Sequence, residues 1–184
     1  MVLLHSPPGE LGSLAPDFSL PGVDGKIHTL GEYQKNPVLV VMFICNHCPY
    51  VLAIEDRLIA LTQALMPQNV QFVAISSNDP TNYPEDSFDN MKLRAKKKSY
   101  PFAYLYDATQ QIAKDYGAVC TPDFFVYDAE RKLRYRGRLD DSPRNPVAVR
   151  KQEMKEAILA LLEGRPVATI QNTTMGCSIK WKES

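Results

Sequence analysis

The chain has 184 residues, of which 45% are hydrophobic and 23% charged, and this composition suits one globular domain with a hydrophobic core. Its 21 Lys and Arg residues balance its 21 Asp and Glu residues, so no overall field recruits nucleic acid or an anionic membrane. No apolar run approaches the ~18 residues that a membrane span needs. The N-terminal segment MVLLHSPPGE lacks the charged and apolar regions of a secretory signal, so we expect a soluble cytoplasmic protein.

The first third of the chain predicts a hairpin, a buried strand and a helix. Residues 17–20 and 26–30 flank an Asp-Gly pair typical of tight turns, which predicts an N-terminal β-hairpin. The run VLVVMFI at 38–44 is continuously apolar, as in a parallel strand covered on both faces. Pro49 suits the first turn of the next helix. The apolar stripe of that helix consists of Val51, Ile54, Leu58, Leu61 and Leu65.

The remaining elements alternate between strands and helices. In chain order they are strand 70–76, helix 84–98, strand 102–107, helix 108–117, two strands within 124–138 and helix 145–162. The lysines at 96–98 match the negative end of a helix dipole, so we interpret them as a solvated helix end. Residues 165–184 form a tail that we expect to pack on a single domain spanning 1–184. The order predicts an α/β fold in which helices flank both faces of a mixed central sheet.

Two cysteines follow the first buried strand. Cys45 and Cys48 lie at the carboxyl edge of the predicted sheet, where α/β folds place their active sites. The pKa of a thiol falls at a helix N-terminus, beside a cation such as a protonated His47, or in a Cys-x-x-Cys pair. Four cysteines in a chain this long are too few for a disulfide scaffold, so redox chemistry, metal binding or burial are their expected uses. A structural zinc site needs a second Cys/His pair at ligand spacing, which is absent, so we expect no metal and no cofactor.

A second motif lies in GAVCTPDFFVYD at 117–128. Pro122 directly precedes a predicted strand, which is unusual for proline unless its peptide bond is cis or it guards a sheet edge. A Cys-x-x-Cys motif after a buried strand, followed later by Thr121-Pro122 before another strand, resembles the thioredoxin fold with its cis-proline loop. This resemblance implies a cis bond, with Cys120 and Thr121 facing the cysteine pair.

Five segments resemble one family over nearly the whole chain. They are APDFSLPGVDGKIHTL, FICNHCPYV, NYPEDSF, VCTPDFFVYD and GCSIKW. Together they are similar to the redoxin, or AhpC/TSA, family and to its peroxiredoxin-like, thioredoxin-related subgroup. The resemblance implies a thioredoxin-like fold and an oxidoreductase that acts through thiols.

The resemblance leaves two registers for the reactive cysteine. In the first, Cys45 attacks, Cys48 resolves the mixed disulfide and His47 stabilises the Cys45 thiolate. In the second, Cys48 takes the helix-start position and Cys45 replaces the threonine of the peroxiredoxin motif. Proline is tolerated at the first position of a helix but destabilises the helix a full turn further in. The helix should therefore begin at Pro49, which places Cys48 at the helix start and favours it as the attacking thiol.

The sequence supports three functions. The first is a thiol-disulfide oxidoreductase in redox homeostasis, which cycles Cys45 and Cys48, acts on protein or small-molecule disulfides, is recharged by a thiol reductant, and is a monomer or homodimer. The second is an antioxidant thiol peroxidase, in which Cys48 reduces a hydroperoxide and Cys45 or Cys120 resolves the sulfenic acid. Its expected arginine is missing at 120–121, and Arg136 or Arg138 replaces it only if the fold brings them in. The third is a thiol metal-binding module.

Three further residues lie near these motifs. We interpret Cys177 as a structural thiol in preference to a resolving one. Glu55 and Asp123 are the carboxylates nearest the motifs, and we interpret both as surface charges rather than as proton shuttles. The site hypothesis also predicts that the sulfurs of Cys45 and Cys48 lie within bonding reach.

Overall fold

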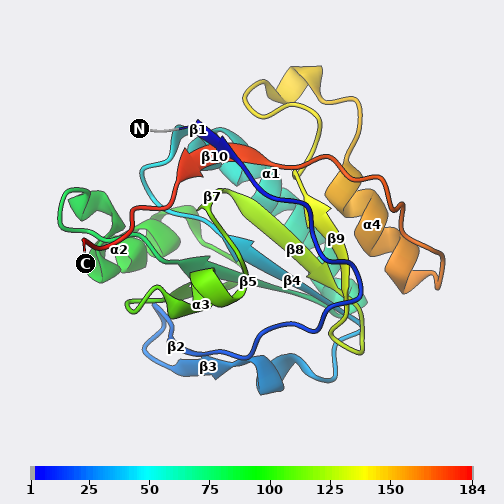
Figure 1. Ribbon diagram of the computed structural model, residues 1–184, viewed down its shortest axis with the longest axis horizontal. Coiled ribbons are helices and arrows are strands. Elements are labelled where there is room, and N and C mark those ends of the chain that lie inside the picture. The colour runs from blue at the N-terminus through cyan, green and yellow to red at the C-terminus, as the bar shows by residue number, and fades with distance from the viewer. Residues whose placement is uncertain (1–2, 184) are drawn as a thin grey trace.

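A five-stranded mixed sheet forms the centre of the computed structural model, which describes residues 3–183 (Figure 1). In sheet order its strands are β6 (Ala103–Tyr106), β5 (Val70–Ser76), β4 (Val38–Phe43), β8 (Asp123–Tyr127) and β9 (Leu133–Gly137). The pairs β4/β5 and β5/β6 are parallel, whereas β8 is antiparallel to β4 and β9 is antiparallel to β8. β4 is therefore a central strand, as its continuous apolar run predicted.

Each face of this sheet carries its own hydrophobic layer. Alternate residues of β4 enter opposite layers: Val40 and Met42 face one side, and Val41 and Phe43 the other. The first side is covered by α1 (Pro49–Leu65), α2 (Phe88–Lys98) and α4 (Glu153–Leu162). The second is covered by α3 (Gln111–Asp115) and by the N-terminal hairpin of β2 (Ser19–Pro21) and β3 (Ile27–Thr29). The mixed sheet, the helices on both faces and the hairpin are confirmed.

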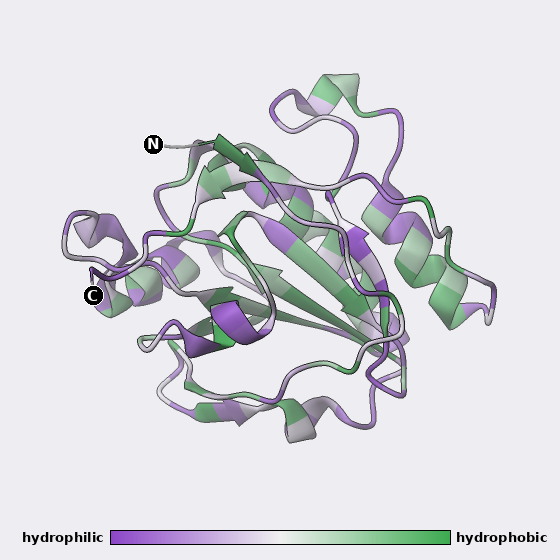
Figure 2. Ribbon diagram, in the orientation of Figure 1, coloured by the Kyte–Doolittle hydropathy of each residue, from purple (hydrophilic) through white to green (hydrophobic). Residues whose placement is uncertain are grey.

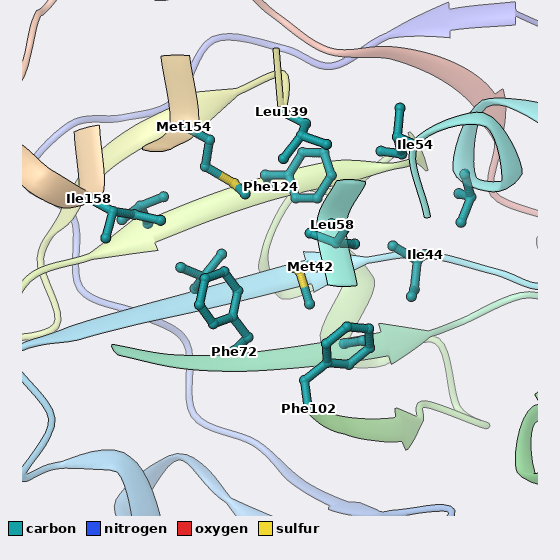
Figure 3. Packing of buried hydrophobic residues seen from close by; sticks show 14 of the residues in the cluster. Met42, Ile44, Ile54, Leu58, Phe72, Phe102, Phe124, Leu139, Met154 and Ile158 are labelled. Carbon is teal, nitrogen blue, oxygen red and sulfur yellow. The ribbon is translucent and has the colours of Figure 1, made fainter. Parts of the chain in front are cut away.

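Apolar burial supports the central strands and the helices packed on them. Figure 2 shows β4 and β5 as hydrophobic and α3 as largely hydrophilic. In Figure 3, Leu58 of α1 and Met154 of α4 point toward Met42 of β4. Burying each large apolar side chain contributes roughly 1.5–3 kcal/mol. Within residues 3–183, none of the helices combines the length and apolarity that crossing a bilayer requires.

A second, three-stranded sheet joins the two ends of the chain to the segment before Pro122. In sheet order its strands are β1 (Leu3–His5), β10 (Met175–Ser178) and β7 (Cys120–Thr121), and both pairs are antiparallel. Figure 1 shows β10 of the C-terminal tail beside β1 of the N-terminal segment. The sequence did not predict this sheet, because strands of two to four residues carry no detectable periodicity.

The predicted helix at 145–162 is wrong in its first half. The Asn145 side chain accepts a hydrogen bond from the Val147 N–H at 3.2 Å, but it caps only a 3-10 turn. Val147, an apolar member of the predicted stripe, is 85% exposed, so nothing packs the chain into a helix there. The α-helix begins at Glu153 instead.

The 3-10 segments are η1 (Leu30–Tyr33), η2 (Met66–Gln68), η3 (Pro84–Asp86) and η4 (Pro146–Ala148).

Candidate active site

The junction between β4 and α1 places both motif cysteines inside the protein. β4 ends at Phe43, and α1 begins at Pro49 with Cys48 as its extended N-cap residue (φ −67°, ψ 120°). Proline at the first helical position needs no hydrogen-bond partner for its nitrogen, so the helix starts here without cost. Cys48 has no exposed surface and Cys45 is 3% exposed. The reactive sulfurs are therefore covered, although they lie at the carboxyl end of β4.

The segment before Pro122 contacts both sulfurs. The Thr121-Pro122 peptide bond is cis, which confirms that prediction. The Thr121 side-chain oxygen lies 3.3 Å from Cys45 Sγ. In its thiol form Cys48 donates a hydrogen bond to the Thr121 carbonyl oxygen at 3.1 Å. Ionisation of Cys48 removes that bond, so the thiolate depends on other donors.

The donors around Cys48 lower its pKa to about 5. The largest cause is the hydrogen bond that the Cys45 thiol donates to the Cys48 sulfur, and it outweighs the burial that opposes ionisation. The Cys177 thiol donates a second bond, and the main-chain N–H groups of Val51 and Cys177 also favour the thiolate. The same hydrogen bond, together with burial, raises the pKa of Cys45 well above its usual range. Cys48 therefore has the lower pKa of the two thiols, which agrees with the helix-start register.

Cys177 belongs to this cluster of thiols. It lies on β10 opposite Thr121, and its side chain is hydrogen-bonded to the sulfur of Cys48. Burial, followed by this bond to Cys48, raises the pKa of Cys177 to about 12. The sequence placed Cys177 in an aperiodic tail, and nothing in its spacing indicated contact with a motif more than a hundred residues earlier.

His47 is held by a buried carboxylate and lies next to Cys45, the thiol with which the first register paired it. His47 Nδ1 lies 2.5 Å from Asp86 Oδ2 and 4.0 Å from Cys45 Sγ. Its ring stacks on Tyr83 with centroids 4.6 Å apart. Asp86 has no exposed surface and also accepts hydrogen bonds from the Asn46 N–H and the Asn78 side chain, each at 2.7 Å. Nothing in the sequence pattern indicated this contact between Asp86 and His47, which are 39 residues apart.

One set of side chains among the described residues has the composition of a metal site. The ligand atoms of Cys45, His47 and Asp86 lie within 4.8 Å of one another. Three such ligands with an open fourth position resemble the donor set of a catalytic zinc site. The two Asp86 oxygens already accept hydrogen bonds from three donors, which a bound ion would have to displace.

Cys120 is turned away from the thiol cluster. Neighbouring strand residues point to opposite faces, and because Thr121 contacts Cys45, Cys120 faces the other way. Its sulfur lies 3.9 Å from the Pro122 carbonyl oxygen, and burial followed by the charge of Asp123 raises its pKa. Its proposed part in redox chemistry stays a prediction.

The interpretation of Asp123 as a surface charge is wrong. Asp123 has no exposed surface, and its Oδ2 accepts a hydrogen bond from the Arg136 guanidinium at 2.8 Å. Burial, partly offset by Arg136, raises the pKa of Asp123 to about 6. Arg138 is likewise paired with a carboxylate, because it donates two hydrogen bonds to Glu153 at 2.7 and 2.9 Å. Both guanidinium groups are thus engaged by carboxylates, although Arg138 also lines the pocket next to Pro122.

Glu55 is likewise buried, which corrects its placement on the surface of α1. Arg94 donates two hydrogen bonds to its carboxylate at 2.8 and 2.5 Å, and the Tyr100 hydroxyl donates a third at 2.5 Å. Burial opposes its ionisation, but these bonds and Lys98 outweigh burial and lower the pKa of Glu55. Glu55 therefore links α1 to α2 through Arg94. Among the described residues, none of its hydrogen bonds involves a cysteine.

An open pocket lies next to Pro122. It is lined by residues of α1, β8, β10 and the loop after β9, including Tyr50, Ile54, Phe124, Leu139 and Met175. The lining also includes His5, Arg138 and Asp140, so the pocket beside the cis-proline segment combines apolar surface with charged side chains.

Comparisons with known proteins agree with this geometry. A sequence model described as the AhpC/TSA family matches residues 11–136. The solved structure of an uncharacterized conserved protein from Geobacillus kaustophilus is 49% identical, covers 100% of this chain and 98% of that chain, and has a TM-score of 0.96. The thiol-disulfide oxidoreductase ResA of Geobacillus thermodenitrificans is 25% identical over 126 residues, 67% of each protein. Chloroplastic peroxiredoxin Q of Populus jackii is 28% identical over 110 residues, 58% of this chain and 46% of that protein.

More distant structures share the fold. Thioredoxins and thiol-disulfide oxidoreductases that are 16% to 23% identical superpose with TM-scores of 0.57 to 0.63. They confirm the predicted thioredoxin-like fold. Since the family model also covers more than half of the residues, including both the Cys-x-x-Cys and the Thr-Pro motifs, this chain belongs to the AhpC/TSA family.

Proposed function

We propose that the chain is a thiol-disulfide oxidoreductase that cycles Cys45 and Cys48 between dithiol and disulfide. The observation that carries this proposal is that Thr121 contacts both motif cysteines at the start of α1: its carbonyl oxygen lies 3.1 Å from Cys48 Sγ and its side-chain oxygen 3.3 Å from Cys45 Sγ. A thiolate beside a second thiol is the arrangement that disulfide exchange uses. The similarity to ResA, which is named a thiol-disulfide oxidoreductase, supports the same chemistry.

In the first step the Cys48 thiolate attacks a substrate disulfide. A bond forms between Cys48 Sγ and one substrate sulfur, while the substrate disulfide breaks and its other sulfur leaves as a thiolate. Cys45 then attacks the Cys48 sulfur, forms the Cys45 to Cys48 disulfide and releases the second substrate thiolate. The substrate gains the two electrons that the dithiol loses, and an external thiol reductant restores the dithiol.

Cys45 must lose its proton before it attacks. In the mixed disulfide Cys48 carries no charge, so the interaction that holds the Cys45 proton is gone. His47 Nδ1 lies 4.0 Å from Cys45 Sγ and is hydrogen-bonded to Asp86. We assign the role of proton acceptor for Cys45 to this His47 and Asp86 pair, and not to Glu55 or Asp123.

The cis-proline segment supplies a binding edge in this proposal. An extended substrate segment would pair its main chain with Thr121, as in strand addition, and direct a side chain into the pocket next to Pro122. A segment of a protein or peptide that contains a disulfide fits both features.

Reduction of insulin disulfides by dithiothreitol tests the proposal. The wild-type chain should accelerate the reaction, and Cys48→Ser should lose at least a hundredfold of that acceleration because it removes the attacking thiolate. Cys120→Ser is the comparison variant: its sulfur lies against the Pro122 carbonyl oxygen, so we expect it to keep most of the activity, and a large loss would instead support the predicted redox role of Cys120. A Cys48→Ser protein as active as the wild type would refute the proposal.

Thiol peroxidase activity is the second candidate. The low pKa of Cys48 at a helix start and the similarity to peroxiredoxin Q favour it, whereas the engagement of Arg136 and Arg138 elsewhere disfavours it. Rapid mixing of the reduced protein with hydrogen peroxide distinguishes the two functions. A fast, stoichiometric loss of thiols that disappears in Cys48→Ser would establish peroxidase activity.

A further inference from the structure

The C-terminal strand β10 covers the edge of the cis-proline segment. β10 pairs antiparallel with β7, so that Cys177 lies opposite Thr121 and Ser178 opposite Cys120, and its other edge pairs with β1 (Figure 1). Gly176 crosses the segment so closely that a Cβ atom there would lie 2.1 Å from the Thr121 carbonyl oxygen. β10 therefore occupies the main-chain edge at which the proposed function places a substrate segment.

The same strand brings a third sulfur to the redox pair. Cys177 lies opposite Thr121, whose carbonyl oxygen accepts the hydrogen bond of Cys48, and Cys45, Cys48 and Cys177 pack in one buried cluster. The side chain and the main-chain N–H of Cys177 both favour the Cys48 thiolate by lowering its pKa. Cys177 is 3% exposed and Cys48 is fully buried, so both sulfurs are shielded from bulk solvent. Cys177 lies where the sulfur of a strand-paired substrate would meet Cys48.

We propose that β10 is an internal occupant of the substrate edge and that Cys177 is a third redox cysteine, which forms a disulfide with Cys48. The proposal deepens the proposed function and rests on it. A substrate segment reaches Thr121 only after β10 has left β7. When β10 returns, it displaces that segment and brings the Cys177 sulfur back to Cys48.

The chemical step is a thiol-disulfide exchange. Cys177, as a thiolate, attacks Cys48 Sγ in the mixed disulfide, a bond forms between these two sulfurs, and the bond from Cys48 to the substrate breaks. The substrate leaves as a thiolate and takes up the proton that Cys177 lost. Cys45 can then attack Cys48, which forms the Cys45 to Cys48 disulfide and restores the Cys177 thiol. No oxidant or reductant beyond the substrate disulfide is consumed.

Oxidised glutathione and four variants that lack Cys45 test this step. The first three proteins are Cys45→Ser, Cys45→Ser/Cys177→Ser and Cys45→Ser/Cys120→Ser. Each is reduced, mixed with oxidised glutathione, quenched with acid and alkylated. Intact mass and peptide mapping then identify what is bound to Cys48. Serine at 177 keeps a hydroxyl donor toward Cys48, so the comparison isolates the redox role. A fourth variant, Cys45→Ser/Cys177→Ala, removes the side-chain donor as well. Near-ultraviolet circular dichroism of every variant checks that a difference in bound glutathione is not caused by misfolding.

We expect Cys45→Ser and the Cys120 control to yield a peptide that joins Cys48 to Cys177. The variants that lack Cys177 should retain at least tenfold more glutathione on Cys48. Equal retention in all variants, with no peptide joining Cys48 to Cys177, would overturn the role of Cys177 and leave the proposed function intact. If no variant carries glutathione or a disulfide at Cys48, the proposed function itself is overturned.

Discussion

The low pKa of Cys48 makes the stability of the reduced protein depend on pH, and Cys48→Ser should remove this dependence. The folded chain holds Cys48 as a thiolate above about pH 5, whereas the unfolded chain keeps it protonated up to an ordinary pKa of 9.0. Between these values the unfolded state binds one more proton than the folded state, so the free energy of unfolding rises with pH. This stabilisation is complete above the unfolded pKa and is lost as pH falls through the folded pKa.

The size of the effect follows from one proton per chain. The slope is up to about 1.4 kcal/mol per pH unit, so the difference in unfolding free energy between wild type and Cys48→Ser should grow by about 2.7 kcal/mol from about pH 6 to about pH 8. Burial of Cys48 leaves no solvent to screen this effect. Asp123, with a pKa raised to about 6, acts in the opposite direction, because the folded state binds its proton more tightly. Both proteins contain Asp123, so its effect cancels in the difference.

Urea unfolding of both proteins at several pH values, with a phosphine reductant present, measures this difference. Cys120→Ser is the control, since the pKa of Cys120 is raised and its thiol stays neutral across this range. Its stability should follow the wild-type curve with a constant offset. Parallel curves for wild type and Cys48→Ser would show that Cys48 is not ionised in the folded protein, and the reasoning on its donors would be refuted.

Three other substitutions probe single contacts of the site and its support. Cys45→Ala removes the main donor to Cys48 and should raise the pKa of Cys48, seen as a higher midpoint in the ultraviolet titration of the thiolate; an unchanged midpoint would contradict this. Gly176→Ala places a methyl group against Thr121 and should destabilise the protein by roughly 1–3 kcal/mol and speed alkylation of Cys48, unless β10 shifts freely. Glu55→Gln should cost about 2 kcal/mol in urea unfolding without changing disulfide reductase activity, and lost activity in a folded variant would show a wider role.

The central fold could be predicted because its signals are local. β4 is a continuous apolar run, α1 carries an apolar stripe after Pro49, and the two are neighbours in the chain. A proline directly before a strand is unusual, which drew attention to Pro122. The cis bond itself was predicted from the resemblance to the thioredoxin fold. These features fix the sheet, the helix start and the position of Cys48.

The contacts that tune the site depend on residues far apart in the chain. β10 joins Cys177 to Thr121 through a strand of four residues, for which no pattern exists in the sequence. Asp86 approaches His47 from another element, and Glu55 is buried only because Arg94 is there to pair with it. Carboxylates are rarely buried unless they are paired, so a carboxylate whose partner cannot be identified in the sequence is predicted to lie on the surface. Glu55 was misplaced for this reason.

The buried position of Cys48 separates two quantities that set its reactivity. One is the thiolate fraction, which the low pKa brings close to one at neutral pH. The other is the fraction of chains in which β10 has left Thr121, because Cys48 has no exposed surface while β10 is in place. Cys177 links the two, since its side chain favours the Cys48 thiolate and its strand pairs with Thr121. In the proposed mechanism Cys48 is therefore ionised but shielded until a segment that can pair with Thr121 displaces β10, so selectivity among disulfides arises from strand pairing rather than from thiol acidity.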